Sequence, residues 1–189
     1  MELVPIPSQT VGPFFHLGCT QHQSVGTLVS ADTKGERIQL ICRVFDGDGI
    51  AVPDAMIEIW QANAEGRYNH SEDLQDKNLN SFRGFGRLAT NDKGICAFTT
   101  IKPGQVPAND GTLQASHINV SVFARGVLAR LATRIYFAGD PAVSSDPVLA
   151  LVPAERRNTL LAKKKTNQQH EWHFDIHLCG KHETVFFDI

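Results

Sequence analysis

SHINVSVF, residues 116–123, is the stretch from which the fold of this chain can be worked out. Its apolar and polar residues alternate, which is typical of a β-strand with one face on a hydrophobic core. The other face begins with His117 and Asn119, two residues apart, so both side chains point to the same side. This spacing suits a pair of metal ligands, although an asparagine is a weak second ligand. The stretch therefore predicts a core strand with a polar face of functional interest.

Similar β-rich patterns recur at short intervals along the chain, separated by glycine, asparagine and aspartate. Residues 91–94 read Asn-Asp-Lys-Gly, which predicts a hairpin between the strands on either side. Many short strands with a single late helix are typical of an all-β protein, and we expect a mixed β-sandwich. The predicted strands are 37–45, 55–62, 85–90, 94–100, 116–123, 131–137, 171–178 and 184–187.

Composition fits an ordinary globular protein. The chain has 189 residues, with 42% hydrophobic and 20% charged, and we expect one domain over residues 1–189. The net charge of -2 gives no argument for binding nucleic acid or a membrane surface. We find no apolar run long enough to span a bilayer and no signal peptide, and the four scattered cysteines are expected to be reduced and largely buried. A cytoplasmic location follows as the expectation.

Two segments depart from the β pattern. Residues 146–164 have a helical pattern with Pro153 near its start, and the lysines at 163–165 would then complement the helix dipole. Residues 1–20 carry three prolines that break regular structure, together with Phe14 and Phe15. Because apolar side chains need a surface to pack on, we expect this segment to be an ordered arm that packs on a partner chain.

Three polar residues share one face of the last long strand: His173, Asp175 and His177. Their spacing is compatible with a metal site. The alternative is the solvated outer face of an edge strand. We favour the alternative because no fourth ligand is evident.

Three motifs are more specific. They are Trp60-Gln61-Ala62-Asn63-Ala64-Glu65-Gly66-Arg67-Tyr68, Lys102-Pro103-Gly104 and His117-Ile118-Asn119. With these motifs in this order, the chain resembles the intradiol ring-cleaving dioxygenases, which are non-haem Fe(III) enzymes built on a β-sandwich. Residues 7–14 and 183–188 extend the resemblance to both ends, where the chain looks like the iron-lacking α subunits of that family.

The resemblance implies which residues would hold iron. Iron-bearing members use two tyrosines and two histidines, and the matching positions here are Tyr68, Val106, His117 and Asn119. A catalytic arginine of the family matches Gln114. Valine has no donor atom, and a neutral amide is a weak ligand for a hard trivalent ion. We therefore expect no metal on this chain and purely structural roles for Tyr68 and His117.

For function, the resemblance implies an α/β complex in which an iron-bearing β chain cleaves 3,4-dihydroxybenzoate with O2, giving 3-carboxy-cis,cis-muconate. This chain would help to form the substrate site with Thr10, Gly12, Pro13 and Arg125, of which Arg125 would act on the substrate.

Two alternatives stay open from sequence alone. The first alternative is a catalytically dead β-sandwich that serves as a binding or structural module. The second is an independent homomeric dioxygenase with an altered metal site.

Overall fold

The computed structural model describes residues 5–21, 25–70, 82–108, 111–165 and 168–188. Most of the predicted strands are present, and the helices are short. In chain order the elements are α1 (Pro13–His16), η1 (Leu17–Gln21), β1 (Arg37–Phe45), β2 (Met56–Gln61), β3 (Phe85–Ala89), β4 (Ile95–Ile101), β5 (Val106–Pro107), β6 (Leu113–Gln114), β7 (His117–Phe123), β8 (Leu131–Phe137), η2 (Pro141–Ser145), α2 (Pro147–Ala150), η3 (Ala154–Leu160), β9 (Leu161–Lys165) and β10 (Gln168–His177).

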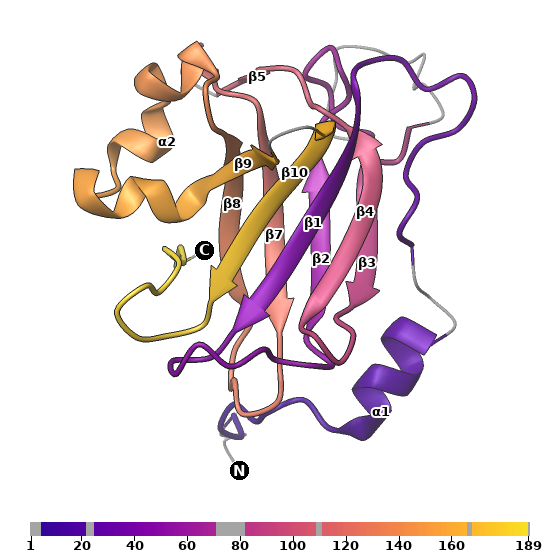
Figure 1. Ribbon diagram of the computed structural model, residues 1–189, viewed down its shortest axis with the longest axis vertical. Coiled ribbons are helices and arrows are strands. Elements are labelled where there is room, and N and C mark those ends of the chain that lie inside the picture. Colours follow the sequence, from indigo (N-terminus) through magenta and orange to yellow (C-terminus); the bar gives the residue numbers. More distant parts are fainter. Residues whose placement is uncertain (1–4, 22–24, 71–81, 109–110, 166–167, 189) are drawn as a thin grey trace.

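Eight strands form a folded-over sheet in the order β3-β2-β7-β8-β9-β10-β1-β4. The two halves face each other across one core, and they are joined at one side where β8 and β9 run parallel (Figure 1). β1 and β10 also pair in parallel, so the sheet is mixed. The predicted mixed β-sandwich is confirmed.

The alternation in residues 116–123 has the expected effect on β7. Ile118, Val120 and Val122 are buried in the main core, opposite residues of β1 and β10 such as Leu40 and Phe174. The other face is not open to solvent throughout, since His117 is only 1% exposed. A second, smaller apolar cluster of η3, α2 and β8 residues covers that end of the strand.

The predicted hairpin at 91–94 is wrong in its pairing. The turn itself is present, with Gly94 N donating to Asn91 O at 2.8 Å. However, β3 pairs with β2, and β4 pairs with β1 in the opposite half of the sheet. The turn thus joins the two layers of the sandwich, because each flanking strand packs its apolar side chains across the core, as Phe98 does from β4.

The late helix is also shorter than predicted. Pro153 cannot donate a backbone hydrogen bond, and it separates α2 from the 3₁₀ helix η3. Residues from Leu161 onward form strand β9, which pairs with both β8 and β10. The lysines at 163–165 therefore lie on a strand and complement no helix dipole. Pairing on both sides outweighs the local helical pattern of this segment.

Three further expectations need correction. β10 lies between β9 and β1, so the strand that carries His173 is not an edge strand. The predicted strand at 184–187 is reduced to a single bridge between Phe187 and Ala132. Prolines do not prevent regular structure throughout the N-terminal segment, because Pro13 occupies the first turn of α1, where a missing N–H costs nothing.

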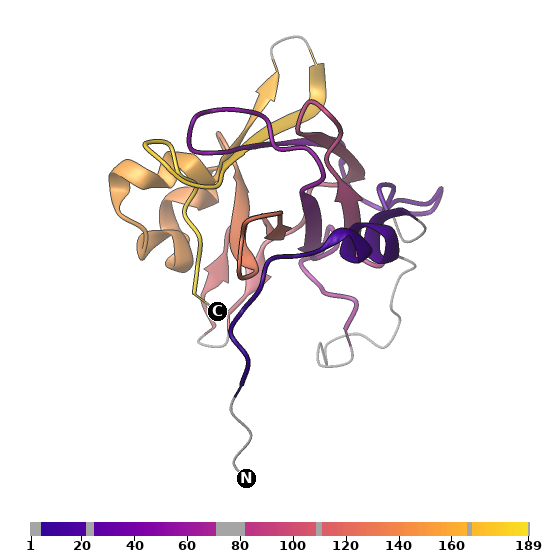
Figure 2. The ribbon, with the colours of Figure 1, turned by 90° about the horizontal axis from the view of Figure 1, so that it is seen from below.

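The N-terminal arm is partly exposed and partly packed on the sheet. Its first described residues project away from the sheets (Figure 2), and Ile6 and Phe14 are 83% and 84% exposed. Phe15, in contrast, lies against Phe123 at the end of β7, with ring centroids 5.5 Å apart.

All four cysteines are free thiols, but only Cys42 and Cys96 are buried. Within the described residues, no helix has the length and apolar character needed to cross a membrane.

Candidate functional site

Two loops meet at the start of β7 through a pair of glycines. Gly66 has φ +77°, and a Cβ there would lie 1.9 Å from the carbonyl oxygen of Gln105. A Cβ on Gly104 would lie 2.4 Å from the carbonyl oxygen of Ala64. Only glycine allows such backbone contact. The contact brings the loop that ends in Tyr68 against the loop that leads to Val106.

Tyr68, His117 and Asn119 form one hydrogen-bonded cluster. The phenolic oxygen of Tyr68 lies 3.4 Å from His117 Nε2 and accepts a hydrogen bond from Asn119 Nδ2 at 3.2 Å. His117 Nδ1 lies 2.7 Å from the carbonyl oxygen of Ala115. A carbonyl can only accept, so Nδ1 carries the proton and Nε2 is left as an acceptor for the phenol. The ring of Tyr68 stacks on Trp60, with centroids 5.7 Å apart.

The cluster is electrically neutral at physiological pH. Burial is the main reason that the pKa of His117 falls to about 4, and the nearby positive charge of Arg134 lowers it further. Burial raises the pKa of Tyr68, although the hydrogen bond from Asn119 and the charge of Arg134 oppose that rise. The imidazole and the phenol are thus both uncharged.

Arg134 connects Asn119 with Gln114, another position at which this chain differs from the iron-bearing pattern. It is the direct cross-strand partner of Asn119, and its Nη1 donates to Gln114 Oε1 at 2.7 Å. Gln114 in turn pairs with Val106 between β6 and β5. Arg134 thus links Asn119 to Gln114, and Gln114 lies opposite Val106 on the neighbouring short strand.

Tyr136 and Asp146 extend this polar region into the smaller apolar cluster. The Tyr136 hydroxyl donates to Asp146 Oδ1 at 2.9 Å, and burial together with the carboxylate raises the pKa of Tyr136. Asp146 is buried and accepts three backbone N–H groups, those of Ala115, Val148 and Leu149. It thus fixes both the chain before β7 and the start of α2.

Sequence reasoning missed Arg134, Tyr136 and Asp146 as parts of this region. Arg134 and Tyr136 are two residues apart on the predicted strand 131–137, so their common face was a detectable signal. Nothing local to the sequence indicated that this face lies beside His117 and Asn119.

The residues at this spot do not fit a ferric ion. Val106 supplies no donor, Asn119 supplies a neutral amide, and the guanidinium of Arg134 adds positive charge where a trivalent cation needs negative charge. Tyr68 and His117 donate and accept hydrogen bonds within the protein instead. We call the neutral cluster of Tyr68, His117 and Asn119, together with Gln114 and Arg134 beside it, the residual site.

The polar side chains of β10 contact neighbouring protein groups, and His177 stacks on Phe45 with ring centroids 5.1 Å apart. Asp175 receives two hydrogen bonds from Arg43, both at 2.6 Å, and His173 Nε2 lies 2.5 Å from a Glu171 carboxylate oxygen. Among the described residues, no three or more His, Cys, Asp or Glu side chains are grouped as a metal ion would need.

The residues assigned to the substrate lie elsewhere. Thr10 Oγ1 accepts a hydrogen bond of 2.7 Å from Gly126 N, which holds the arm against the turn that carries Arg125. Gly12 and Pro13 start α1 immediately after. The Arg125 side chain is 72% exposed and lies 3.9 Å from Asp54. β7 separates Arg125 from His117 by roughly 20 Å. Arg125 and the arm residues held beside its turn therefore do not belong to the residual site.

Comparison with known proteins gives consistent results. A family model described as Dioxygenase matches residues 10–180. The chain is 41% identical over 202 residues to the protocatechuate 3,4-dioxygenase alpha chain of Pseudomonas putida, covering all of this chain and 98% of that one. It is 36% identical over 177 residues to the beta chain of the Burkholderia cepacia enzyme, covering 89% and 75% of the two chains.

Solved structures agree on the fold. Catechol 1,2-dioxygenase from Acinetobacter sp. ADP1 superposes with a TM-score of 0.64 at 24% identity, covering 82% of this chain and 57% of that one. The dioxygenase domain of a carbohydrate-binding fusion from Streptomyces sp. SirexAA-E gives a TM-score of 0.63, covering 96% and 100%.

Proposed function

Because this chain belongs to the intradiol ring-cleaving dioxygenase family, we propose that it is the non-iron-binding α subunit of a protocatechuate 3,4-dioxygenase. The assembly would open the ring of 3,4-dihydroxybenzoate between its two hydroxyl groups, with both atoms of O2 entering the product, 3-carboxy-cis,cis-muconate. The observation that carries this proposal is the full-length identity to α chains combined with a residual site that has lost its metal donors.

Iron would reside on the partner β chain. Two neutral donors, Tyr68 and His117, remain here, and both are used in hydrogen bonds. Arg134 contributes a positive charge beside them. Since anionic ligands are needed to neutralise Fe(III), the energetics favour a chain that keeps the family fold but leaves the metal to its partner.

The arm and the turn after β7 supply a surface for that partner. Phe14 is almost fully exposed in this chain, and Leu128 in the turn after β7 is also exposed. Ile6 and Leu17 of the arm are exposed as well, and packing on a partner would remove these apolar side chains from water. An α/β interface at this surface would bury both residues.

Arg125 would then reach from this surface into the partner's substrate site. Its guanidinium is free to point away from the chain, since the contact with Asp54 is long and exposed. The substrate carries a ring carboxylate that needs a fixed partner, and a guanidinium binds two carboxylate oxygens at once. Thr10, Gly12 and Pro13 would hold the arm so that Arg125 and the partner's pocket stay aligned.

A cytoplasmic location and a single domain over residues 1–189 complete the proposal. The free state of all four cysteines supports the former.

Co-expression tests the proposal. A candidate β chain carrying two motif tyrosines and an H-x-H pair should co-purify with this chain, and the pair should cleave protocatechuate. A β chain that is fully active alone and does not bind this chain would overturn the proposal and favour a binding or structural module.

A further inference from the structure

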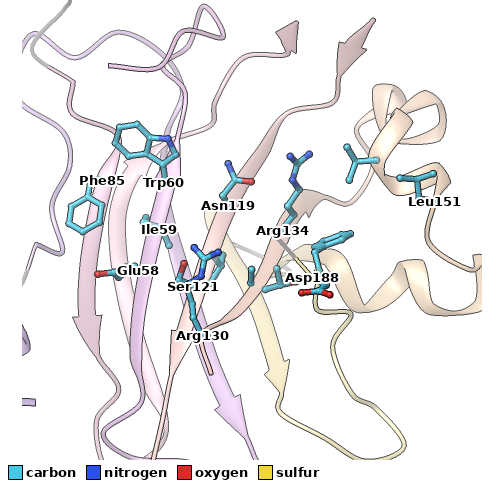
Figure 3. A pocket seen from close by; sticks show the side chains of 15 residues that line it. Glu58, Ile59, Trp60, Phe85, Asn119, Ser121, Arg130, Arg134, Leu151 and Asp188 are labelled. Atoms are coloured by element: carbon cyan, nitrogen blue, oxygen red, sulfur yellow. The ribbon is translucent and has the colours of Figure 1, made fainter. Parts of the chain in front are cut away.

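A cavity of about 670 Å³ lies on the outer face of the half-sheet β3-β2-β7-β8. Figure 3 shows Trp60 and Phe85 on one side of it and Leu151 and Asp188 on the other, with polar side chains of β7 and β8 between them. The floor is therefore part of the rigid sheet, and the wall opposite the aromatic residues is provided by the segments around α2 and the C-terminus.

The floor contains an ordered row of four side chains. Phe85 is paired with Trp60, Trp60 with Asn119, and Asn119 with Arg134, on four successive strands. Side chains that are direct cross-strand partners project from the same face. The row thus changes from two aromatic rings through an amide to a guanidinium, and it runs along one side of the cavity.

Among the described residues, Arg134 makes no ion pair with either of the acidic side chains that line the cavity, Glu58 and Asp188. Within the described parts of the chain, its hydrogen bond goes to the neutral amide of Gln114, and no ion pair includes it. Glu58 is paired with Arg87, whose Nε lies 2.7 Å from the carboxylate, and Asp188 lies on the wall opposite the aromatic residues. A second guanidinium, that of Arg130, borders the cavity as well. A partly enclosed cation of this kind favours an anionic ligand.

We propose that this cavity binds a planar aromatic carboxylate. The carboxylate pairs with Arg134, and the ring lies against Trp60 and Phe85. Trp60 and Arg134 are two strands apart, about 10 Å, which matches the length of a benzoate-sized molecule plus its contact distances. The Trp60 ring is held in place by stacking on Tyr68, so the aromatic wall is formed before the ligand arrives.

The test uses the complex of this chain with its iron-bearing partner and counts bound ligand by equilibrium dialysis with radiolabelled benzoate. The Arg134→Gln complex should bind one benzoate fewer for each copy of this chain, or bind it at least about tenfold more weakly. Arg134→Lys, which keeps the charge, should restore part of the binding. Arg37→Gln removes an exposed arginine from the opposite half of the sheet and should change nothing.

Two controls make the result specific. Uncharged benzamide should not bind this site, and Trp60→Leu should weaken benzoate while leaving co-purification with the partner intact. Equal benzoate counts for the wild-type and Arg134→Gln complexes, or benzamide binding as well as benzoate, would overturn the inference. If no partner co-purifies, the proposed function fails, but the same dialysis on the full chain alone still decides whether this cavity binds the acid.

Discussion

Asn119 Nδ2 donates a hydrogen bond to the phenolic oxygen of Tyr68 across 3.2 Å. That oxygen also lies 3.4 Å from His117 Nε2. Tyr68 and His117, the two residues here with side chains that could bind a metal, therefore hydrogen-bond to each other, and Tyr68 also bonds to the Asn119 amide. Since the pKa of Tyr68 is raised and that of His117 is lowered, neither group carries charge near neutral pH. The arrangement is an uncharged hydrogen-bond network, without the anionic donors that a ferric ion needs.

The first prediction concerns what is needed to restore metal binding. The isolated chain should bind no stoichiometric iron and cleave no catechol. The double variant Val106→Tyr/Asn119→His should still bind iron weakly, because the guanidinium of Arg134 repels a trivalent ion at short range. Adding Arg134→Gln should raise the iron content and the visible tyrosinate absorption. Equal iron content in the double and triple variants would show that Arg134 has no part in excluding the metal.

The second prediction concerns Arg125. Replacing it with alanine in the α/β complex should lower kcat/KM for protocatechuate about 10- to 100-fold, since a hydrogen bond to a charged group contributes roughly 1.5–3 kcal/mol. Plain catechol has no carboxylate and should be affected much less. Asp54→Asn, which removes only the distant ion-pair partner, serves as the control. Similar losses on both substrates would mean that Arg125 supports the interface or the fold.

The third prediction is a pH dependence of stability caused by His117. The unfolded histidine takes up a proton near pH 6.5, whereas the folded one does so only near pH 4. Between these values the unfolded state binds more protons than the folded state does. The contribution of His117 to the free energy of unfolding is therefore fully present above pH 6.5 and is lost as the pH falls to 4. The full loss corresponds to roughly 3 kcal/mol.

Urea unfolding at pH 7.5 and pH 4.5 measures this contribution. His117→Gln should lose less free energy of unfolding between the two pH values than the wild type does, and the exposed His182→Gln should behave like the wild type. A His117→Gln variant with an unchanged pH dependence would contradict the assignment.

The fourth prediction concerns the glycine contact between the two loops. Gly66→Ala meets both a positive φ and the carbonyl oxygen of Gln105, whereas Gly49→Ala meets the same φ range with nothing within 4 Å. The comparison therefore separates the steric clash from the backbone cost, which is about 1–2 kcal/mol. Gly66→Ala should lower Tm by at least about 5 °C more than Gly49→Ala. Equal shifts in Tm would show that the loops separate at little cost.

The sequence was informative where local pattern determines structure. Alternation in residues 116–123 predicted both β7 and its contribution to the core. The family resemblance matched Tyr68, Val106, His117 and Asn119 to the iron-ligand positions of iron-bearing members. The structure brings Tyr68, His117 and Asn119 into contact and links Val106 to them through Gln114 and Arg134.

The parts that could not be predicted depend on contacts between distant segments. The turn at 91–94 was evident, but its assignment to two different layers follows from pairing with β1 and β2. Leu161–Lys165 becomes a strand because β8 and β10 flank it. The sequence places Arg134 on a strand and no more, because its position opposite Asn119 depends on the register between β7 and β8.

The central claim is that this chain contributes to the dioxygenase without holding iron itself, and the iron content of the purified α/β complex tests it most directly. Elemental analysis, with the two chains quantified separately, should give one iron atom per α/β pair. The Tyr68→Phe variant of this chain should leave both that ratio and the visible absorption of the iron unchanged. Two iron atoms per pair, or a loss of iron with Tyr68→Phe, would contradict the account.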